Sequence, residues 1–226
     1  MTRQGEASEA SARLWLGSAE DRGDAGTFLH RVTRLDPAAH VRLRALGDGV
    51  ELWAWLPLDV LVSRRVEAHC DAPDVTVRAG DLLRRLADRS REPVTLPAPE
   101  QVAWSGALPP RTGWRRIDRV PGAEVERLVH AGERAFRAAA PSAANANRVG
   151  AALLDHEALV VSDASEAVPV PLRVPQALAR MGFLARTADR PGAAVAVSVA
   201  AGWARFDAAY GVAYLRRTPA LSLMPI

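Results

Sequence analysis

A glycine turn between two alternating segments constrains the fold of this chain more than any other sequence feature. Residues 40–46 and 50–56 both alternate in side-chain type, and Gly47-Asp48-Gly49 separates them. Period-two alternation on both sides of a glycine-rich turn is typical of a β-hairpin. We therefore expect two antiparallel strands here, which commits this part of the chain to a sheet.

The remaining strand patterns come in sets joined by short turns, with amphipathic helices between the sets. Further strands are expected at 12–16, 59–67, 157–162, 166–170, 193–199, 202–207 and 211–217. Helices are expected from Ser18 to Leu35 and at 81–88, 122–139, 146–155 and 174–182. Because strands follow strands instead of alternating with helices, the order predicts an α+β fold of mixed or antiparallel sheets built from hairpins with packed helices. Two docked α/β halves are one arrangement of that fold.

A proline-rich stretch is the expected boundary between these halves. Five prolines lie in residues 89–113, and no apolar period continues through them. The predicted organisation is a disordered N-terminus (1–11), an N-terminal α+β half (12–88), a connector (89–113) and a C-terminal α+β half (114–226). Trp104 lies inside the connector, and a free linker rarely carries a tryptophan, so we expect one compact unit or two closely docked halves.

The chain contains no lysine, and all 29 basic residues are arginine. Schiff-base enzymes, pyridoxal-phosphate enzymes, Walker phosphate loops and kinase ATP sites all use a lysine, so their ordinary forms are excluded. Residues with GC-rich codons dominate the composition, and we interpret the missing lysine as genomic bias. The net charge is only +3, so the pI near 9.9 reflects arginine and does not indicate nucleic-acid binding.

Motifs for catalysis or metal binding are scarce. Cys70 is the single cysteine, which excludes an intrachain disulfide and a cysteine zinc cluster. His69 beside Cys70, and the run Asp155-His156-Glu157, bring suitable residue types together, but sequence neighbours rarely converge on one site. We expect no catalytic residue, no metal and no cofactor. An enzyme, either a hydrolase or a transferase without a recognisable motif, is the alternative.

The first candidate binding surface is one face of the hairpin. Arg42 and Arg44 share that face with Trp53 and Trp55. In the expected register, Arg44 faces Trp53 and Arg42 faces Trp55, a geometry that permits cation–π contacts. Such a face can bind a base, an aromatic ligand or a partner protein. The alternative is that a helix covers this face and that the tryptophans belong to the core.

The second candidate surface follows from the charge distribution. Residues 1–110 carry a net charge of −2 (14 Arg against 16 acidic residues), and residues 111–226 carry +5 (15 against 10). The densest basic cluster consists of Arg111, Arg115, Arg116 and Arg119 around Trp114, and Asp118 alone opposes it. This asymmetry indicates an anion-facing surface, with an ordinary solvated face as the alternative. The candidate binding residues from this cluster are Arg111, Trp114, Arg115 and Arg116.

A winged helix-turn-helix can be drawn from 122–139, 146–155 and the hairpin 157–171. Its wing tip would carry Asp163 and Glu166, which repel phosphate. Nucleic-acid binding is therefore expected to be absent or weak.

Three phrases of the sequence resemble uncharacterised proteins of actinobacterial, high-GC genomes, a family with no known activity. They are Arg34-Leu35-Asp36-Pro37, Leu108-Pro109-Pro110-Arg111 with Gly113-Trp114, and Ala179-Arg180-Met181-Gly182-Phe183-Leu184. The resemblance implies no functional residue.

No secretory signal and no apolar run of about eighteen residues occurs, so we expect a cytoplasmic protein without a membrane span. Together these patterns predict a non-catalytic binding or regulatory protein that acts through Arg/Trp-rich surfaces on a protein partner. The C-terminal tail, 218–226, is apolar and carries no charged side chain. We expect the tail to dock on its own domain or across a homodimer interface.

Overall fold

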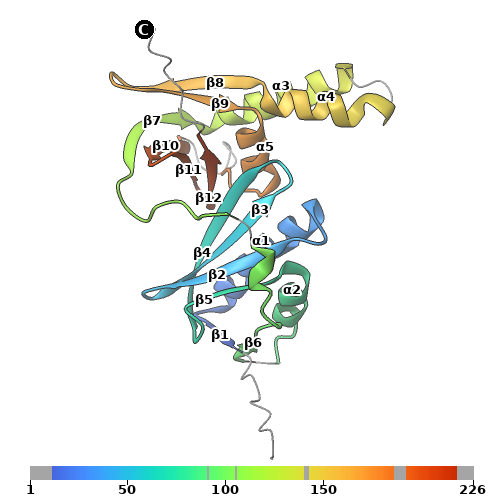
Figure 1. Cartoon of the computed structure of the whole chain (residues 1–226), viewed down its shortest axis with the longest axis vertical. Helices are drawn as coiled ribbons and strands as arrows, with labels where there is room; N and C mark the ends of the chain where they lie inside the picture. The colour runs from blue at the N-terminus through green and yellow to red at the C-terminus, as the bar shows by residue number, and fades with distance from the viewer. Residues whose placement is uncertain (1–11, 91, 105, 140–142, 186–191, 218–226) are drawn as a thin grey trace, which may run out of the picture. The chain divides into compact units, whose positions relative to one another are not determined.

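The computed structural model describes residues 12–217, except 91, 105, 140–142 and 186–191. The predictions for 1–11 and for 218–226 lie outside this range. Five α-helices and antiparallel sheets make up the described chain, which confirms the α+β fold (Figure 1). No helix in the described ranges is long and apolar enough to cross a membrane.

Contacts along the chain group it into two compact units. Unit 1 comprises Met1–Leu52 and Arg65–Ser105, and unit 2 comprises Trp53–Arg64 and Gly106–Ile226. The division passes through two strands, β3 (Gly49–Leu56) and β4 (Val60–Cys70), whose connecting tip belongs to unit 2. The sequence-based boundary at 89–113 stays a prediction.

Unit 1 holds the first helices and an antiparallel sheet. Its strands are ordered β5-β2-β3-β4-β1-β6. The bounds not yet given are β1 Arg13–Leu16, β2 His40–Leu46, β5 Asp74–Arg78, β6 Val94–Thr95, α1 Ala19–Leu35 and α2 Ala79–Ala87. The predicted hairpin is therefore present as β2 and β3.

Helix α1 begins as its sequence indicates. The Ser18 hydroxyl accepts a hydrogen bond from the Asp21 backbone N–H (3.1 Å), which satisfies one of the unpaired N–H groups of the first turn. Phe28, Leu29 and Val32 lie three or four residues apart and are all buried. Helix α1 packs against α2, whose buried Leu82 and Leu86 continue this apolar core.

Part of the proline-rich stretch is fastened to β5. The Glu100 N–H donates to the Thr76 carbonyl (2.8 Å), just before a 3-10 helix, η1 (Gln101–Ala103). The Glu100 carboxylate also accepts hydrogen bonds from His40 Nε2 (2.8 Å) and Arg78 Nε (3.0 Å). The bond from His40, and then the one from Arg78, lowers the pKa of Glu100. This segment is therefore an ordered part of unit 1 although it has no apolar period.

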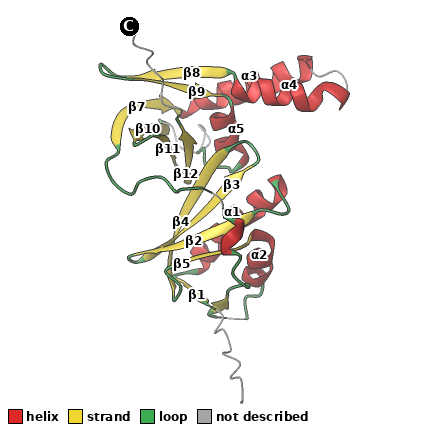
Figure 2. Ribbon diagram, viewed as in Figure 1, coloured by secondary structure: helices red, strands yellow, loops and turns green. Residues whose placement is uncertain are grey.

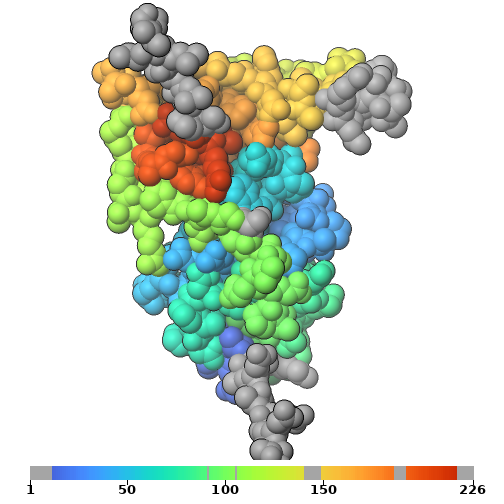
Figure 3. All heavy atoms as spheres, in the orientation of Figure 1, coloured from blue at the N-terminus to red at the C-terminus, as the bar shows by residue number. Residues whose placement is uncertain are grey.

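Unit 2 contains the strands of the antiparallel sheet that are ordered β4-β12-β11-β10-β7 (Figure 2). Its own strands are β7 Arg115–Pro121, β10 Ala194–Ala200, β11 Trp203–Ala208 and β12 Gly211–Arg216. Its helices are α3 Gly122–Ala139, α4 Ala143–Asp155 and α5 Arg173–Arg180, and β8 Glu157–Ser162 pairs only with β9 Ala167–Pro171. Figure 3 shows the lime-green surface of the segment around β7 beside the orange-red surface of β10–β12.

One face of this sheet is covered by helices and by the β8–β9 hairpin. Val195 and Phe206 from the sheet line the same apolar space as Val125 of α3 and Leu178 of α5. Helix α5 ends at a glycine in the left-handed region, Gly182 (φ 59°), where the next N–H returns to the Leu178 carbonyl (2.9 Å). The helices thus occupy one side of the sheet, and the candidate site lies on the other.

Candidate functional site

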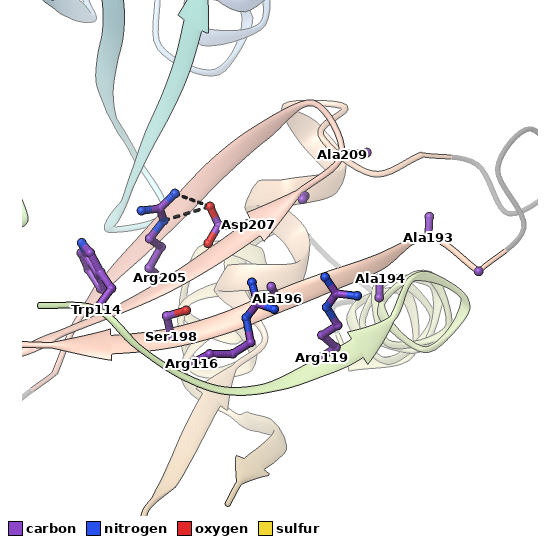
Figure 4. Close-up of a pocket in the computed structure, with 12 residues that line it drawn as sticks. Trp114, Arg116, Arg119, Ala193, Ala194, Ala196, Ser198, Arg205, Asp207 and Ala209 are labelled. Atoms are coloured by element: carbon purple, nitrogen blue, oxygen red, sulfur yellow. Dashed lines mark hydrogen bonds and ion pairs between the residues drawn. The ribbon is translucent and has the colours of Figure 1, made fainter. Parts of the chain in front are cut away.

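The face of the unit 2 sheet that points away from the helices holds an open pocket, here called the arginine pocket. Its volume is about 670 Å³. The larger and polar side chains of its lining are Trp114, Arg116, Arg119, Ser198, Arg205 and Asp207, and the rest of the lining consists of alanine and glycine (Figure 4). Because alanine and glycine have little or no side chain, they do not cover the charged groups, which remain open to solvent.

Strand register explains why these side chains share one face. Ser198 of β10 pairs with Arg205 of β11 on one side and with Arg116 of β7 on the other. Two residues away along β10, and therefore on the same face, Ala196 pairs with Asp207 and with Arg119. Directly paired residues in antiparallel strands point to the same side of the sheet.

A β-bulge in β7 places both of its arginines in the pocket. Residues three apart on a regular strand point to opposite faces. Between Val197 and Ser198 of β10 the partners change from Asp118 to Arg116, so Ile117 is an extra residue on β7. The bulge turns Arg116 and Arg119 to the same side, as Figure 4 shows, and Ile117 is buried.

The three arginines differ in how their charges are neutralised. Arg205 Nε donates to Asp207 Oδ1 (2.9 Å), and the guanidinium lies 5.7 Å from the Trp114 ring centre. Arg116 and Arg119 have no ion pair or hydrogen bond to any other described residue. The pocket therefore offers two uncompensated guanidinium groups beside an ordered one.

An aromatic cluster adjoins the arginine pocket. The Trp114 ring lies 6.0 Å from that of Tyr214, which lies 5.1 Å from that of Trp53, and the Trp55 ring lies 6.3 Å from that of Trp203. Trp53 and Tyr214 are only 5% and 4% exposed. The Trp114 indole also donates to the Pro110 carbonyl (2.9 Å), so the pocket has a fixed aromatic wall.

The structure corrects the first candidate surface. Trp53 is buried by Tyr214 and does not belong to an exposed binding face. Arg42 lies over Trp104 (5.7 Å) and, together with Arg44, it contacts the Asp74 carboxylate. The reason is β5, a strand that the sequence pattern did not predict, which places Asp74 directly opposite Arg44.

The residues of the second candidate surface lie on different sides of the sheet. Trp114 and Arg116 line the pocket, and Arg111 lies exposed in the preceding loop. Arg115 points to the other face of β7, where it pairs with Asp163 and Glu166. It is thus the residue of this cluster whose charge is already neutralised.

The tip of the β8–β9 hairpin is a closely bonded turn. Asp163 accepts hydrogen bonds from the Ser165 N–H (2.8 Å) and hydroxyl (2.9 Å), and then from the Glu166 N–H (2.8 Å) and Arg115. These bonds lower the pKa of Asp163 from 3.8 to about 2. Arg217 holds Glu166 as well, so both carboxylates of the predicted wing tip bind arginines of their own unit.

Four residues of the pocket were not among the predicted binding residues: Arg119, Ser198, Arg205 and Asp207. Strand β7 contains mostly charged residues, and its apolar Ile117 and Val120 stand three apart because of the bulge, so no strand period is visible. Arg205 and Asp207 lie on a predicted strand, where they alternate with the apolar residues Ala204 and Phe206. This alternation could have indicated that Arg205 and Asp207 share a solvent-facing side of the strand.

The single cysteine and the possible metal ligands of the described residues were the remaining candidates for chemistry. Cys70 is buried, and burial raises the pKa of its thiol. Among the described residues, no group of three His, Cys, Asp or Glu is placed to hold a metal ion. The unpaired guanidinium groups of the arginine pocket are of a kind that binds anions.

Two family models match the chain. Residues 9–106 match a domain of unknown function (DUF8010), and residues 109–220 match a second domain of unknown function (DUF8185). A search of curated proteins found no match.

Solved structures show what the fold is similar to. The DNA polymerase sliding clamp from Caulobacter crescentus is 15% identical, with a TM-score of 0.53, and the match covers 96% of this chain and 69% of that one. The clamp from Bacillus subtilis is 12% identical (TM-score 0.53; 95% and 67% covered). The DNA polymerase III subunit beta from Pseudomonas aeruginosa is 14% identical (TM-score 0.52; 95% and 68% covered). The chain therefore has a sliding-clamp-like fold.

Proposed function

We propose that this protein is a non-catalytic binding protein whose arginine pocket docks an acidic segment of a protein partner. The proposal is supported above all by Arg116 and Arg119, two exposed guanidinium groups on one sheet face with no carboxylate paired to them within the described chain. Arginine binds carboxylates with two parallel hydrogen bonds, which gives both affinity and orientation.

The aromatic wall supports a protein ligand. Trp114 is partly exposed, and its ring is fixed by Arg205 on one side and by the Pro110 carbonyl at the indole nitrogen. Tryptophan and arginine are the residues that most often dominate the binding energy of protein interfaces. A fixed side chain also loses little conformational freedom when a partner binds.

A protein ligand fits this pocket better than a nucleic acid. Affinity for nucleic acid comes mainly from many phosphate contacts along a basic stripe. Here Asp207 lies inside the pocket, and the two free arginines are the only basic groups of the pocket without a carboxylate partner among the described residues. A long phosphate backbone would find few further contacts, whereas a short acidic side chain can reach one guanidinium at a time.

The test is a binding titration with a labelled acidic peptide of about ten residues that alternates glutamate and valine. The variant Arg116→Glu with Arg119→Glu reverses both free charges. Each lost charge-assisted hydrogen bond contributes about 1.5–3 kcal/mol, so binding should weaken by more than tenfold.

The matched control is Arg127→Glu with Arg134→Glu, which changes the net charge equally at two exposed positions of α3. We expect this control to bind like the unmodified protein. Equal loss in both variants would mean that the peptide responds to net charge alone, and the proposal would then be wrong. Tighter binding of a single-stranded oligonucleotide that displaces the peptide would also overturn it.

A further inference from the structure

Strand β7 is the terminal strand of the unit 2 sheet, and it borders the arginine pocket. It pairs with β10 on one side, and no described residue pairs with the backbone on its other side. The side chains of Arg115, Arg116, Asp118 and Arg119 are exposed along it. In Figure 3 the lime-green segment that contains β7 is open to solvent. Such an edge presents backbone N–H and C=O groups that can pair with another strand.

The charges of β7 select what can pair with it. Arg116 and Arg119 carry the unpaired positive charges of this strand on one face, so two copies of β7 would bring like charges together. Like charges on neighbouring strands oppose pairing. An acidic strand meets the opposite condition, because its carboxylates would approach Arg116 and Arg119 from the adjacent position on the same face.

We infer that the acidic partner segment binds in an extended conformation, as an additional strand on the free edge of β7. This inference rests on the proposed function and adds the binding mode. Backbone hydrogen bonds to β7 supply sequence-independent affinity, and alternate side chains supply selectivity. Acidic side chains at every second position of the added strand lie on the sheet face of Arg116 and Arg119. The intervening side chains lie on the opposite face, which the β8–β9 hairpin covers.

The bulge at Ile117 fits this mode. A bulge usually discourages an edge from pairing, because it bends the strand and increases its twist. Here the same distortion turns two arginines to one face, where they lie at the margin of the sheet. The edge is thus poorly suited to a flat, uncharged strand and suited to one that carries acidic groups on that face.

The experiment separates backbone pairing from side-chain attraction. The alternating glutamate–valine peptide is made in two N-methylated forms, one methylated at the glutamates and one at the valines. In a strand added to an edge, only alternate N–H groups point to the sheet. Methylation of that set should weaken binding at least roughly tenfold, and methylation of the other set should change it by less than roughly twofold.

The results distinguish this inference from the proposed function. If both methylated peptides bind like the unmodified one, strand addition is wrong, while loss in Arg116→Glu with Arg119→Glu still supports the pocket. Equal weakening by both methylation patterns also overturns strand addition. If the free protein is a dimer that the same double variant converts to a monomer, a second copy occupies the edge and the acidic strand is excluded.

Discussion

At the scale of single residues, the charges of unit 2 fall into paired and free sets. Arg115 is held by Asp163 and Glu166, and Arg205 is held by Asp207. Arg116 and Arg119 remain without a carboxylate among the described residues. Exposed ion pairs contribute little to stability, about 0–1 kcal/mol each, so this arrangement matters more for what the surface attracts than for folding.

The Asp163 carboxyl should titrate at a pH well below that of an ordinary aspartate. Its pKa is lowered to about 2, first by the N–H and the hydroxyl of Ser165. A carboxylate with a lowered native pKa stabilises the fold fully above its unfolded pKa of 3.8, and this contribution is lost as the pH falls through about 2. NMR titration of Asp163 checks the value, and Ser165→Ala should raise it. A midpoint near 3.8 in the unmodified protein would contradict the hydrogen bonds described.

The Cys70 thiol should be unreactive in the folded protein. It is 5% exposed, and burial raises its pKa, which reduces the thiolate that attacks disulfide reagents. We expect a thiol reagent to label Cys70 slowly near pH 8 and rapidly once denaturant unfolds the chain. Rapid labelling of the native protein would show that β4 opens at this end.

At the scale of elements, two helical glycines should respond oppositely to alanine. A Cβ at Gly132 of α3 would lie 2.6 Å from a methyl group of the buried Leu172. A Cβ at Gly23 of α1 would have no neighbour within 4 Å. Alanine favours a helix over glycine by about 1 kcal/mol, whereas overpacking costs about 1–3 kcal/mol.

Chemical denaturation therefore should give a higher free energy of unfolding for Gly23→Ala and a lower one for Gly132→Ala. A stabilised Gly132→Ala variant would mean that Leu172 can move aside at no cost.

The elements that sequence could predict are those with an unbroken period. The hairpin of β2 and β3, the cap of α1 at Ser18 and the end of α5 at Gly182 are all confirmed. Strand β5 was missed because it is short. Its three central residues, Val75–Val77, are all buried, so the sequence shows no alternation between an apolar and a polar face. Strand β7 was missed because its bulge breaks the alternation, and the pocket depends on that bulge.

The candidate site was predictable only in part for a related reason. Trp114 and Arg116 stand in one dense cluster of the sequence, so composition alone indicated them. Arg205 and Ser198 reach the same pocket through the pairing of strands far apart in the chain. Register of that kind depends on tertiary packing, which a single sequence does not display.

At the scale of the whole molecule, the chain path interleaves the two units. Residues 53–64 belong to unit 2 although unit 1 flanks them in the sequence. Within unit 2, Leu61 and Val62 of β4 pair with β12, and Trp53 packs on Tyr214. Unit 2 is therefore not formed by the second half of the chain alone.

A single cut in residues 89–113 should leave the two fragments associated. Separation would strip β4 from β12 and expose Tyr214 and Trp203, which are now buried. Limited proteolysis followed by gel filtration without denaturant should give one peak at the mass of the intact protein. Two stable and separable fragments would contradict this arrangement.

The docking of an acidic segment is tested most directly by locating the peptide on the protein. The NMR signals to follow are the side-chain Nε–H groups of Arg116 and Arg119 and the Trp114 indole, during titration with the alternating glutamate–valine peptide. If the arginine pocket is the docking site, these three signals shift together and saturate, and that of Arg127 on α3 stays unchanged. Saturating shifts on α3 with no change at Arg116 and Arg119 would contradict the proposed function.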